Sequence, residues 1–193
     1  MPQGITGIIL AGGQGRRFGG VDKGLLELHG KPLIEYVINA LRPQTDALII
    51  NANRNLDVYT RYGFPVISDS AGLHGPLAGI ASTLSAITTD YALTAPCDSP
   101  FLPADLGIRL ITSLEQNNAD LAVAHDGQRL QPLFLLLKKS LILSLQYYLM
   151  HDRKVELWVM SQRHIVTDFS DQTSGFININ TALDYRHAET MRD

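Results

Sequence analysis

The chain has 193 residues, of which 45% are hydrophobic and 18% charged, so it can bury a core of ordinary globular size. Its formal net charge of −3 gives no general attraction to nucleic acid, and no apolar run reaches the roughly 18 residues that a membrane helix needs. A single cysteine, Cys97, excludes an internal disulfide and a cysteine-based zinc cluster. The N-terminal residues do not resemble a signal peptide. We therefore expect a cytoplasmic protein whose partners include neither nucleic acid nor membrane.

The first 117 residues alternate apolar runs with segments of helical periodicity. Residues 5–11 are rich in isoleucine, which is typical of a strand buried on both faces. Apolar residues of 32–42 recur at helical spacing, and Pro32 suits a first helical turn. The same reasoning predicts strands at 47–53, 65–69 and 91–98, and helices at 55–62, 76–87 and 103–117. Repeated strand–helix units predict a mainly parallel sheet with helices on both faces.

The pattern becomes less regular after Asp120. Strands are expected at 119–126, 131–137, 164–170 and 175–180, and a helix at 140–151, whereas 155–162 receives no assignment. A last helix starts at Thr181, which forms a capping-box-like pair with Asp184. We expect a single α/β/α domain over residues 1–193, three-layered and Rossmann-like, with a mainly parallel sheet that includes an antiparallel strand in its second half.

Residues 10–24, LAGGQGRRFGGVDKG, concentrate glycine and positive charge at the end of the first predicted strand. Glycines let backbone N–H groups approach an anion closely, and arginine and lysine add contacts to phosphate oxygens. The carboxyl ends of parallel strands are also where such sheets bind ligands. A phosphate-binding loop is therefore favoured over a flexible, charged turn. The dinucleotide fingerprint GxGxxG fails because Phe18 occupies its third glycine position, and the P-loop pattern GxxxxGK[ST] is absent.

The loop matches instead the signature LAGGxxxRxGxxK of the nucleotidylyltransferases. The matching residues are Leu10, Ala11, Gly12, Gly13, Arg17, Gly19 and Lys23. The longer string GGVDKGLLELHGKPL resembles the molybdenum cofactor guanylyltransferase family, bacterial enzymes that join GMP to molybdopterin. The resemblance continues through NANR (51–54), SDS (68–70), GPLAG (75–79), PCDSPFLP (96–103) and FININT (176–181). It spans nearly the whole chain in family order, and Phe18, where the family usually has methionine, is a conservative departure.

This resemblance implies a fold of the nucleotide-diphospho-sugar transferase type and a transfer of GMP from GTP to molybdenum-molybdopterin. The residues expected to bind GTP are Leu10, Ala11, Gly12, Gly13, Arg17, Lys23, Asn51, Asp69 and Asp98. Arg17, Lys23 and Asp98 are the expected catalytic residues. Lys23 is expected to contact the α-phosphate, where charge develops in the transition state.

Asp98 and two asparagines carry the remaining site predictions. Asp98 ends a predicted strand opposite the glycine-rich loop, where a carboxylate can hold Mg²⁺; the alternative is an ordinary loop aspartate. Asn178 and Asn180 alternate along a predicted strand and so share one face. The resemblance assigns that face to molybdopterin, and the alternative is the solvent side of an edge strand. For Cys97, a small buried residue is favoured over a nucleophile.

Two other readings stay open from the sequence. One is a related nucleotidylyltransferase, such as a molybdopterin cytidylyltransferase or a sugar-phosphate enzyme, because base choice depends on pocket edges. The other is a nucleotide-binding carrier or regulatory subunit that has kept the fold. The family further implies transient contacts with molybdenum-insertion proteins and apo-molybdoenzymes, and we expect a monomer.

Overall fold

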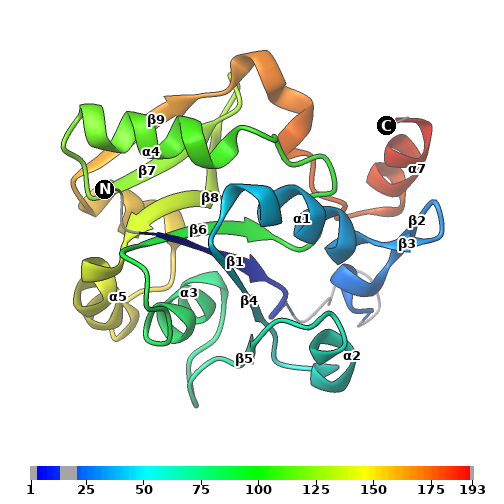
Figure 1. Ribbon diagram of the computed structural model, residues 1–193, viewed down its shortest axis with the longest axis horizontal. Helices are drawn as coiled ribbons and strands as arrows, with labels where there is room; N and C mark the ends of the chain where they lie inside the picture. The colour runs from blue at the N-terminus through cyan, green and yellow to red at the C-terminus, as the bar shows by residue number, and fades with distance from the viewer. Residues whose placement is uncertain (1–3, 14–20, 192–193) are drawn as a thin grey trace.

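A seven-stranded sheet runs through the middle of the protein (Figure 1). The computed structural model describes residues 4–13 and 21–191. The sheet order is β5-β4-β1-β6-β8-β7-β9. The strands span Ile5–Leu10 (β1), Ala47–Asn51 (β4), Val66–Ile67 (β5), Tyr91–Pro96 (β6), Leu121–His125 (β7), Leu130–Lys138 (β8) and His164–Asp168 (β9). Only β8 runs antiparallel to its neighbours, so the mainly parallel sheet with one antiparallel strand in its second half is confirmed.

Helices cover both faces of this sheet. They span Leu33–Leu41 (α1), Leu56–Thr60 (α2), Pro76–Leu84 (α3), Leu106–Gln116 (α4), Ile142–Leu149 (α5), Val155–Ser161 (α6) and Ala182–Thr190 (α7). Buried side chains of α1 and α4 form one core with one face of the sheet, and those of α3, α5 and α6 form a second core with the other face. The predicted α/β/α layering is therefore confirmed.

A small third unit lies beside the sheet. Strands β2 (Glu27–Leu28) and β3 (Lys31–Pro32) form an antiparallel hairpin, and His29 and Gly30 take positive φ angles at its turn. Helix α7 lies against this hairpin (Figure 1), and Leu28, Leu33, Ile179 and Ala188 bury one another there. The hairpin was not predicted, because its strands are only two residues long.

Two segments differ from the sequence-based expectation. Residues 175–180 are not a strand: a 3₁₀ helix covers Ser170–Phe176, and the chain after it is extended without joining the sheet. Residues 155–162, left unassigned, contain α6, whose Trp158 is fully buried in the second core. The predicted cap of the last helix is confirmed, because Thr181 Oγ1 accepts a hydrogen bond from the Asp184 backbone N–H at 3.1 Å.

The register of the central strands sets the position of the site. Leu10 pairs with Asn51 on β4 and with Pro96 on β6, so all three parallel strands end at the same level. The chain runs from β1 outward to β5 on one side and then returns through α3 to β6 on the other side of β1. Strand order therefore reverses at β1, and in open α/β sheets ligands bind in the crevice at such a reversal.

No helix in the described part of the chain is long and apolar enough to cross a membrane.

Candidate active site

A cavity of about 430 Å³ opens at the carboxyl ends of β1, β4 and β6. Most of the predicted site residues that the structure describes line it. They are Leu10, Ala11, Gly12, Gly13, Lys23, Asn51, Asp98, Asn178 and Asn180. Asp69 is the exception, because it lies behind Asn51 and is not part of the lining. Arg17 falls in residues 14–20, outside the described part of the chain.

Lys23 is the point at which distant segments of the sequence meet. Its Nζ forms an ion pair with Asp98 Oδ2 at 3.1 Å and donates a hydrogen bond to Asn180 Oδ1. Lys23 comes from the segment after the glycine-rich loop, Asp98 from the end of β6, and Asn180 from the segment before α7. The Lys23 side chain is 21% exposed and the Asp98 side chain 11% exposed, and both face the cavity. This pairing can hold a phosphate and a metal ion next to each other.

The segment that carries Asn178 and Asn180 is fixed from its opposite side. Ile179, between them, is fully buried in the third core, and its backbone N–H donates to the Asp98 carbonyl at 2.9 Å. Asn178 Oδ1 accepts a hydrogen bond from Ser99 Oγ. The alternation predicted for a strand therefore holds in an extended segment outside the sheet: one apolar side chain points into the core and the flanking amides face the cavity.

Asn51 closes the cavity at the end of β4 with only 2% of its surface exposed. Its Nδ2 donates to Ile67 O at 3.0 Å and to Asp69 Oδ1 at 2.9 Å. The other Asp69 oxygen accepts from Asn53 Nδ2 at 2.8 Å, so Asp69 orients two amides from behind the cavity wall. The packing is tight, since a Cβ on Gly79 would lie 2.1 Å from Asn51 Oδ1.

Asp22 was not singled out from the sequence, although it precedes Lys23 and lines the same cavity. It is 7% exposed and accepts hydrogen bonds from Tyr59 Oη at 2.6 Å and Asn55 Nδ2 at 2.9 Å, with Arg54 Nε 3.5 Å away. These partners come from α2 and the residues before it, so Asp22 ties the segment of Lys23 to that helix. An acidic residue next to the predicted phosphate-binding lysine was the available signal.

Helix α3 and Cys97 complete the wall. Gly75, with φ +95°, precedes the first helical residue Pro76, and both line the cavity, so the first turn of α3 faces it. Cys97 is buried, and burial, followed by the charges of Asp98 and Asp22, raises the pKa of its thiol. A protonated thiol is a poor nucleophile, which agrees with a packing role for Cys97.

A second cavity of similar volume continues from the first. The two share Leu133, Asn178 and Asn180, and the second extends along β8 to Arg129, Gln131 and Glu156. The site is therefore an elongated cleft with Lys23 and Asp98 in its first half. Such a shape suits a reaction between two bound molecules.

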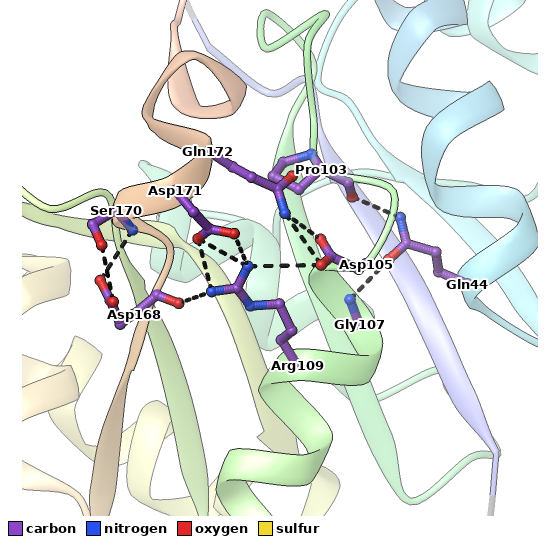
Figure 2. Close-up of polar contacts among 9 residues, drawn as sticks. All are labelled: Gln44, Pro103, Asp105, Gly107, Arg109, Asp168, Ser170, Asp171 and Gln172. Carbon is purple, nitrogen blue, oxygen red and sulfur yellow. Dashed lines mark hydrogen bonds and ion pairs between the residues drawn. The ribbon is translucent and has the colours of Figure 1, made fainter.

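A polar cluster behind the cleft fixes the segment leading to Asn178 (Figure 2). The Arg109 guanidinium, from α4, makes hydrogen bonds of 3.0 Å to both carboxylate oxygens of Asp171 and also donates to the carbonyl of Asp168. The same group stacks over the Phe169 ring at 4.1 Å. Gln172 donates to the Asp105 carboxylate at the start of α4. None of these residues was predicted from the sequence, because their partners lie about 60 residues apart.

Asp98 is a candidate metal ligand in this cavity. Its Oδ1 accepts no hydrogen bond from the described residues, whereas Oδ2 faces Lys23. No group of three or more His, Cys, Asp or Glu side chains in the described ranges could hold a metal by itself. Mg²⁺ commonly binds through one or two carboxylates, with phosphates and water completing its shell. The Asp98 carboxylate, in a cavity of about 430 Å³, therefore fits a metal that arrives with a nucleotide.

Comparison with known proteins agrees with this geometry. Residues 7–166 match the family model of the MobA-like NTP transferase domain. A Shewanella putrefaciens protein named molybdenum cofactor guanylyltransferase is 49% identical over 183 residues, which cover 94% of each chain. Molybdopterin-guanine dinucleotide biosynthesis protein A from Archaeoglobus fulgidus superimposes with a TM-score of 0.82 at 24% identity, over 95% of this chain and 96% of that one.

A more distant structure, of a Mycobacterium tuberculosis protein in complex with manganese, has a TM-score of 0.72 at 17% identity, over 99% of this chain and 100% of the other. That likeness shows the fold alone. The family model covers most of this chain, and the Shewanella relative is nearly half identical to it over almost its full length. The chain therefore belongs to the MobA-like NTP transferases, as a nucleotidyltransferase of the molybdenum cofactor guanylyltransferase family.

Proposed function

We propose that this protein transfers GMP from GTP to molybdenum-molybdopterin, forming the molybdopterin guanine dinucleotide cofactor and releasing pyrophosphate. One observation carries the proposal: Lys23, Asp98 and Asn180 meet in an elongated cleft at the carboxyl ends of the central strands. One half of that cleft suits a nucleoside triphosphate and the other half an acceptor. Family membership supports the identity of both substrates.

We assign GTP to the half of the cleft next to β1 and β4. The proposed contacts are Leu10, Ala11, Gly12, Gly13, Arg17, Lys23, Asn51 and Asp98, with Asp69 acting through Asn51. Gly12 suits this role because its Cα lies against Asn51 and Asn53, where a Cβ would come within 2.8 Å of Asn53 Nδ2. Backbone N–H groups at such a position can approach phosphate oxygens.

We propose Mg²⁺ as the metal and Asp98 as its protein ligand. When bound, a divalent ion supplies charge neutralisation on the triphosphate. Lys23, beside Asp98, adds positive charge that stabilises the charge developing at the α-phosphate. Because Lys23 is held by both Asp98 and Asn180, its ammonium group is positioned before any ligand binds.

The chemical step is an in-line displacement. An oxygen of the acceptor's terminal phosphate attacks the α-phosphorus of GTP, forming a new P–O bond as the bond to the β-phosphate oxygen breaks and pyrophosphate leaves. The protein contributes positioning and charge rather than a covalent intermediate. Asn178 and Asn180 hold the acceptor in the second half of the cleft, and Asn180 also orients Lys23.

We further propose that residues 1–193 act as one nucleotidyltransferase domain, as a monomer in the cytoplasm. Transient contacts with molybdenum-insertion proteins and apo-molybdoenzymes would deliver its substrate and receive its product. The buried Cys97 is compatible with a reducing compartment.

The test has two parts. Titration calorimetry with GTP, ATP and CTP in the presence of Mg²⁺ should show tightest binding for GTP. Incubation of α-phosphate-labelled GTP with molybdenum-molybdopterin should then transfer label to the acceptor and release unlabelled pyrophosphate. Equal or tighter binding of CTP would replace guanylyl by cytidylyl transfer, and nucleotide binding without label transfer would indicate a carrier.

A further inference from the structure

We propose that the far end of the second cavity, lined by Arg129, Gln131 and Glu156, recognises the 2-amino-4-oxo edge of the acceptor's pterin ring. The proposal rests on the proposed function, because it takes molybdopterin as the acceptor. These three residues would bind the pterin edge directly.

The position of the reacting groups sets the direction of the acceptor. Its terminal phosphate must lie at Lys23 and Asp98, where the α-phosphate of the nucleotide is held. The rest of the acceptor can extend only past Asn178 and Asn180, which both cavities share. The part most distant from the phosphate is the pterin ring, so it reaches the end of the cleft formed by β8 and the first turn of α6.

Gln131 is the strongest evidence for a polar ligand at that end. It is only 5% exposed and lines the cavity, and its Nε2 donates to Asp126 Oδ2 at 2.6 Å. Burying a side-chain amide is costly unless its hydrogen-bonding groups find partners. Oε1 of Gln131 accepts no hydrogen bond from the described residues and is not among their buried unpaired atoms, so it is accessible to a ligand in the cavity.

Asp126 determines the orientation of the Gln131 side-chain amide. Burial raises the pKa of Asp126, but hydrogen bonds from the backbone N–H groups of Arg129 and Gln128, both 2.8 Å, and from Gln131 outweigh it and hold that pKa below its usual value. An ionised carboxylate can only accept hydrogen bonds, so the NH₂ group of Gln131 must face it. The amide oxygen is thereby left as an acceptor for a ligand.

The polar groups of this end match the pterin edge. That edge presents N–H donors at its amino group and ring nitrogen, and an acceptor at its 4-oxo oxygen. The site offers acceptors on Gln131 and Glu156 and a guanidinium donor on Arg129. Leu130, Pro132 and Leu133 supply apolar walls for the ring faces.

The test uses free pterins that lack the phosphate. Fluorescence titration with 6-hydroxymethylpterin is performed on the protein already saturated with GTP and Mg²⁺, so that the guanine pocket is filled. The matching lumazine, in which an oxo group replaces the 2-amino group, is titrated in parallel. We expect pterin to bind about tenfold more tightly than lumazine, because lumazine presents an acceptor to the acceptors of the site.

Gln131→Leu should weaken pterin binding about tenfold and remove the discrimination against lumazine. The matched control is Gln128→Leu, since Gln128 lies in the turn just before β8 but lines neither cavity. Glu156→Gln, on the surface of α6, provides a second variant that leaves the buried Gln131 untouched.

The proposal is overturned if pterin fails to bind the GTP-saturated protein, if lumazine binds as well as pterin, or if Gln131→Leu and Glu156→Gln both retain wild-type discrimination. A failure of the proposed function is seen separately, as an absence of label transfer from GTP by the wild-type protein. If Gln131→Leu fails to fold, Glu156→Gln and the pterin–lumazine comparison still decide the matter.

Discussion

At the scale of single residues, Asp98, the metal ligand that we propose, is nearly buried. Only 8% of the surface of the whole residue is exposed, so a truncation would also disturb packing. Asp98→Asn keeps the shape of the side chain and removes its charge. We expect Asp98→Asn to lower turnover by about two orders of magnitude or more, because charge neutralisation on the triphosphate is lost. Pyrophosphate release measures turnover, and circular dichroism on the same sample checks the fold.

The control for Asp98 is Asp57→Asn, which removes a carboxylate from the exposed side of α2. This variant should retain wild-type turnover. Near-wild-type turnover in Asp98→Asn would show that the metal is held elsewhere.

Tyr59 tests the support of the Lys23 segment. It is fully buried, and burial above all, together with the hydrogen bond to Asp22 and the charge of that carboxylate, raises its pKa, so the hydroxyl stays a donor to Asp22. Tyr59→Phe leaves a buried carboxylate oxygen without that donor. We expect the free energy of unfolding to fall by about 1–3 kcal/mol, as measured by urea denaturation, and GTP affinity to fall with it.

Tyr62→Phe is the matched control for Tyr59, since its hydroxyl makes no hydrogen bond to the described residues. Equal stability of the two variants would show that Asp22 does not depend on the bond from Tyr59.

At the scale of elements, the extended segment 177–180 unites the two halves of the site. Asn178 accepts a hydrogen bond from Ser99, whereas Asn180 accepts one from Lys23, in the half of the cleft that we assign to GTP. We therefore expect Asn178→Ala to raise the KM for molybdopterin up to about tenfold and to leave GTP affinity unchanged. Asn180→Ala should weaken both, because Lys23 loses one of its two partners. Calorimetry with GTP and kinetics at limiting acceptor separate the effects.

The reverse pattern would contradict this division. If Asn178→Ala weakened GTP binding and left acceptor use unaltered, the segment would belong to the nucleotide half of the cleft.

Helix α4 acts on the same segment through Arg109. Loss of the guanidinium in Arg109→Ala removes the bonds to Asp171 and the stacking on Phe169, which hold the chain before Asn178 (Figure 2). Both charged groups are partly exposed, so we expect a modest stability loss of about 1 kcal/mol. The KM for molybdopterin should rise several-fold while the Kd for GTP stays constant.

Arg109→Lys keeps the charge and should restore part of the acceptor KM, although lysine cannot reproduce the bidentate contact. Arg61→Ala, which breaks an exposed ion pair on α2, is the control. A parallel loss of GTP affinity in Arg109→Ala would indicate general destabilisation instead.

At the scale of the whole molecule, Asp120 links three strands of the sheet. Hydrogen bonds from Arg163 and Lys138, at 2.9 and 2.8 Å, lower the pKa of Asp120. A carboxyl group whose pKa is lower in the folded state than in the unfolded state stabilises the fold at pH values above the unfolded pKa, which is about 3.9 for Asp. This stabilisation is lost as the pH falls through the pKa of the folded state. The melting temperature should therefore decline below about pH 4.

Asp120→Asn should show a shallower decline, since the linked carboxyl is absent. Asp90→Asn serves as control, because the Asp90 side chain makes no hydrogen bond to the described residues. Identical pH profiles of wild type and Asp120→Asn between pH 3 and 7 would show that other carboxyls govern acid unfolding.

Several parts of this protein follow from local sequence alone. Hydrophobic periodicity predicted the alternating strands and helices and the mixed sheet, because burial on one or two faces leaves a regular pattern. The cap at Thr181 and the glycine-rich segment after β1 were equally local. The clustering of Lys23, Asn51 and Asp98 could be anticipated, since residues after parallel strands gather at one edge.

Other parts depended on contacts between distant segments, which no local pattern records. The segment 175–180 has the alternation of a strand, yet Ile179 packs between α7 and the β2–β3 hairpin, so its amides face the cleft without joining the sheet. Three hydrogen bonds likewise could not be predicted from the sequence: those of Asp22 with Tyr59 of α2, of Arg109 with Asp171, and of Gln131 with Asp126. Local patterns therefore predict the residue types near the site, whereas the meeting of particular side chains follows from the folded chain, because packing between elements sets their distances.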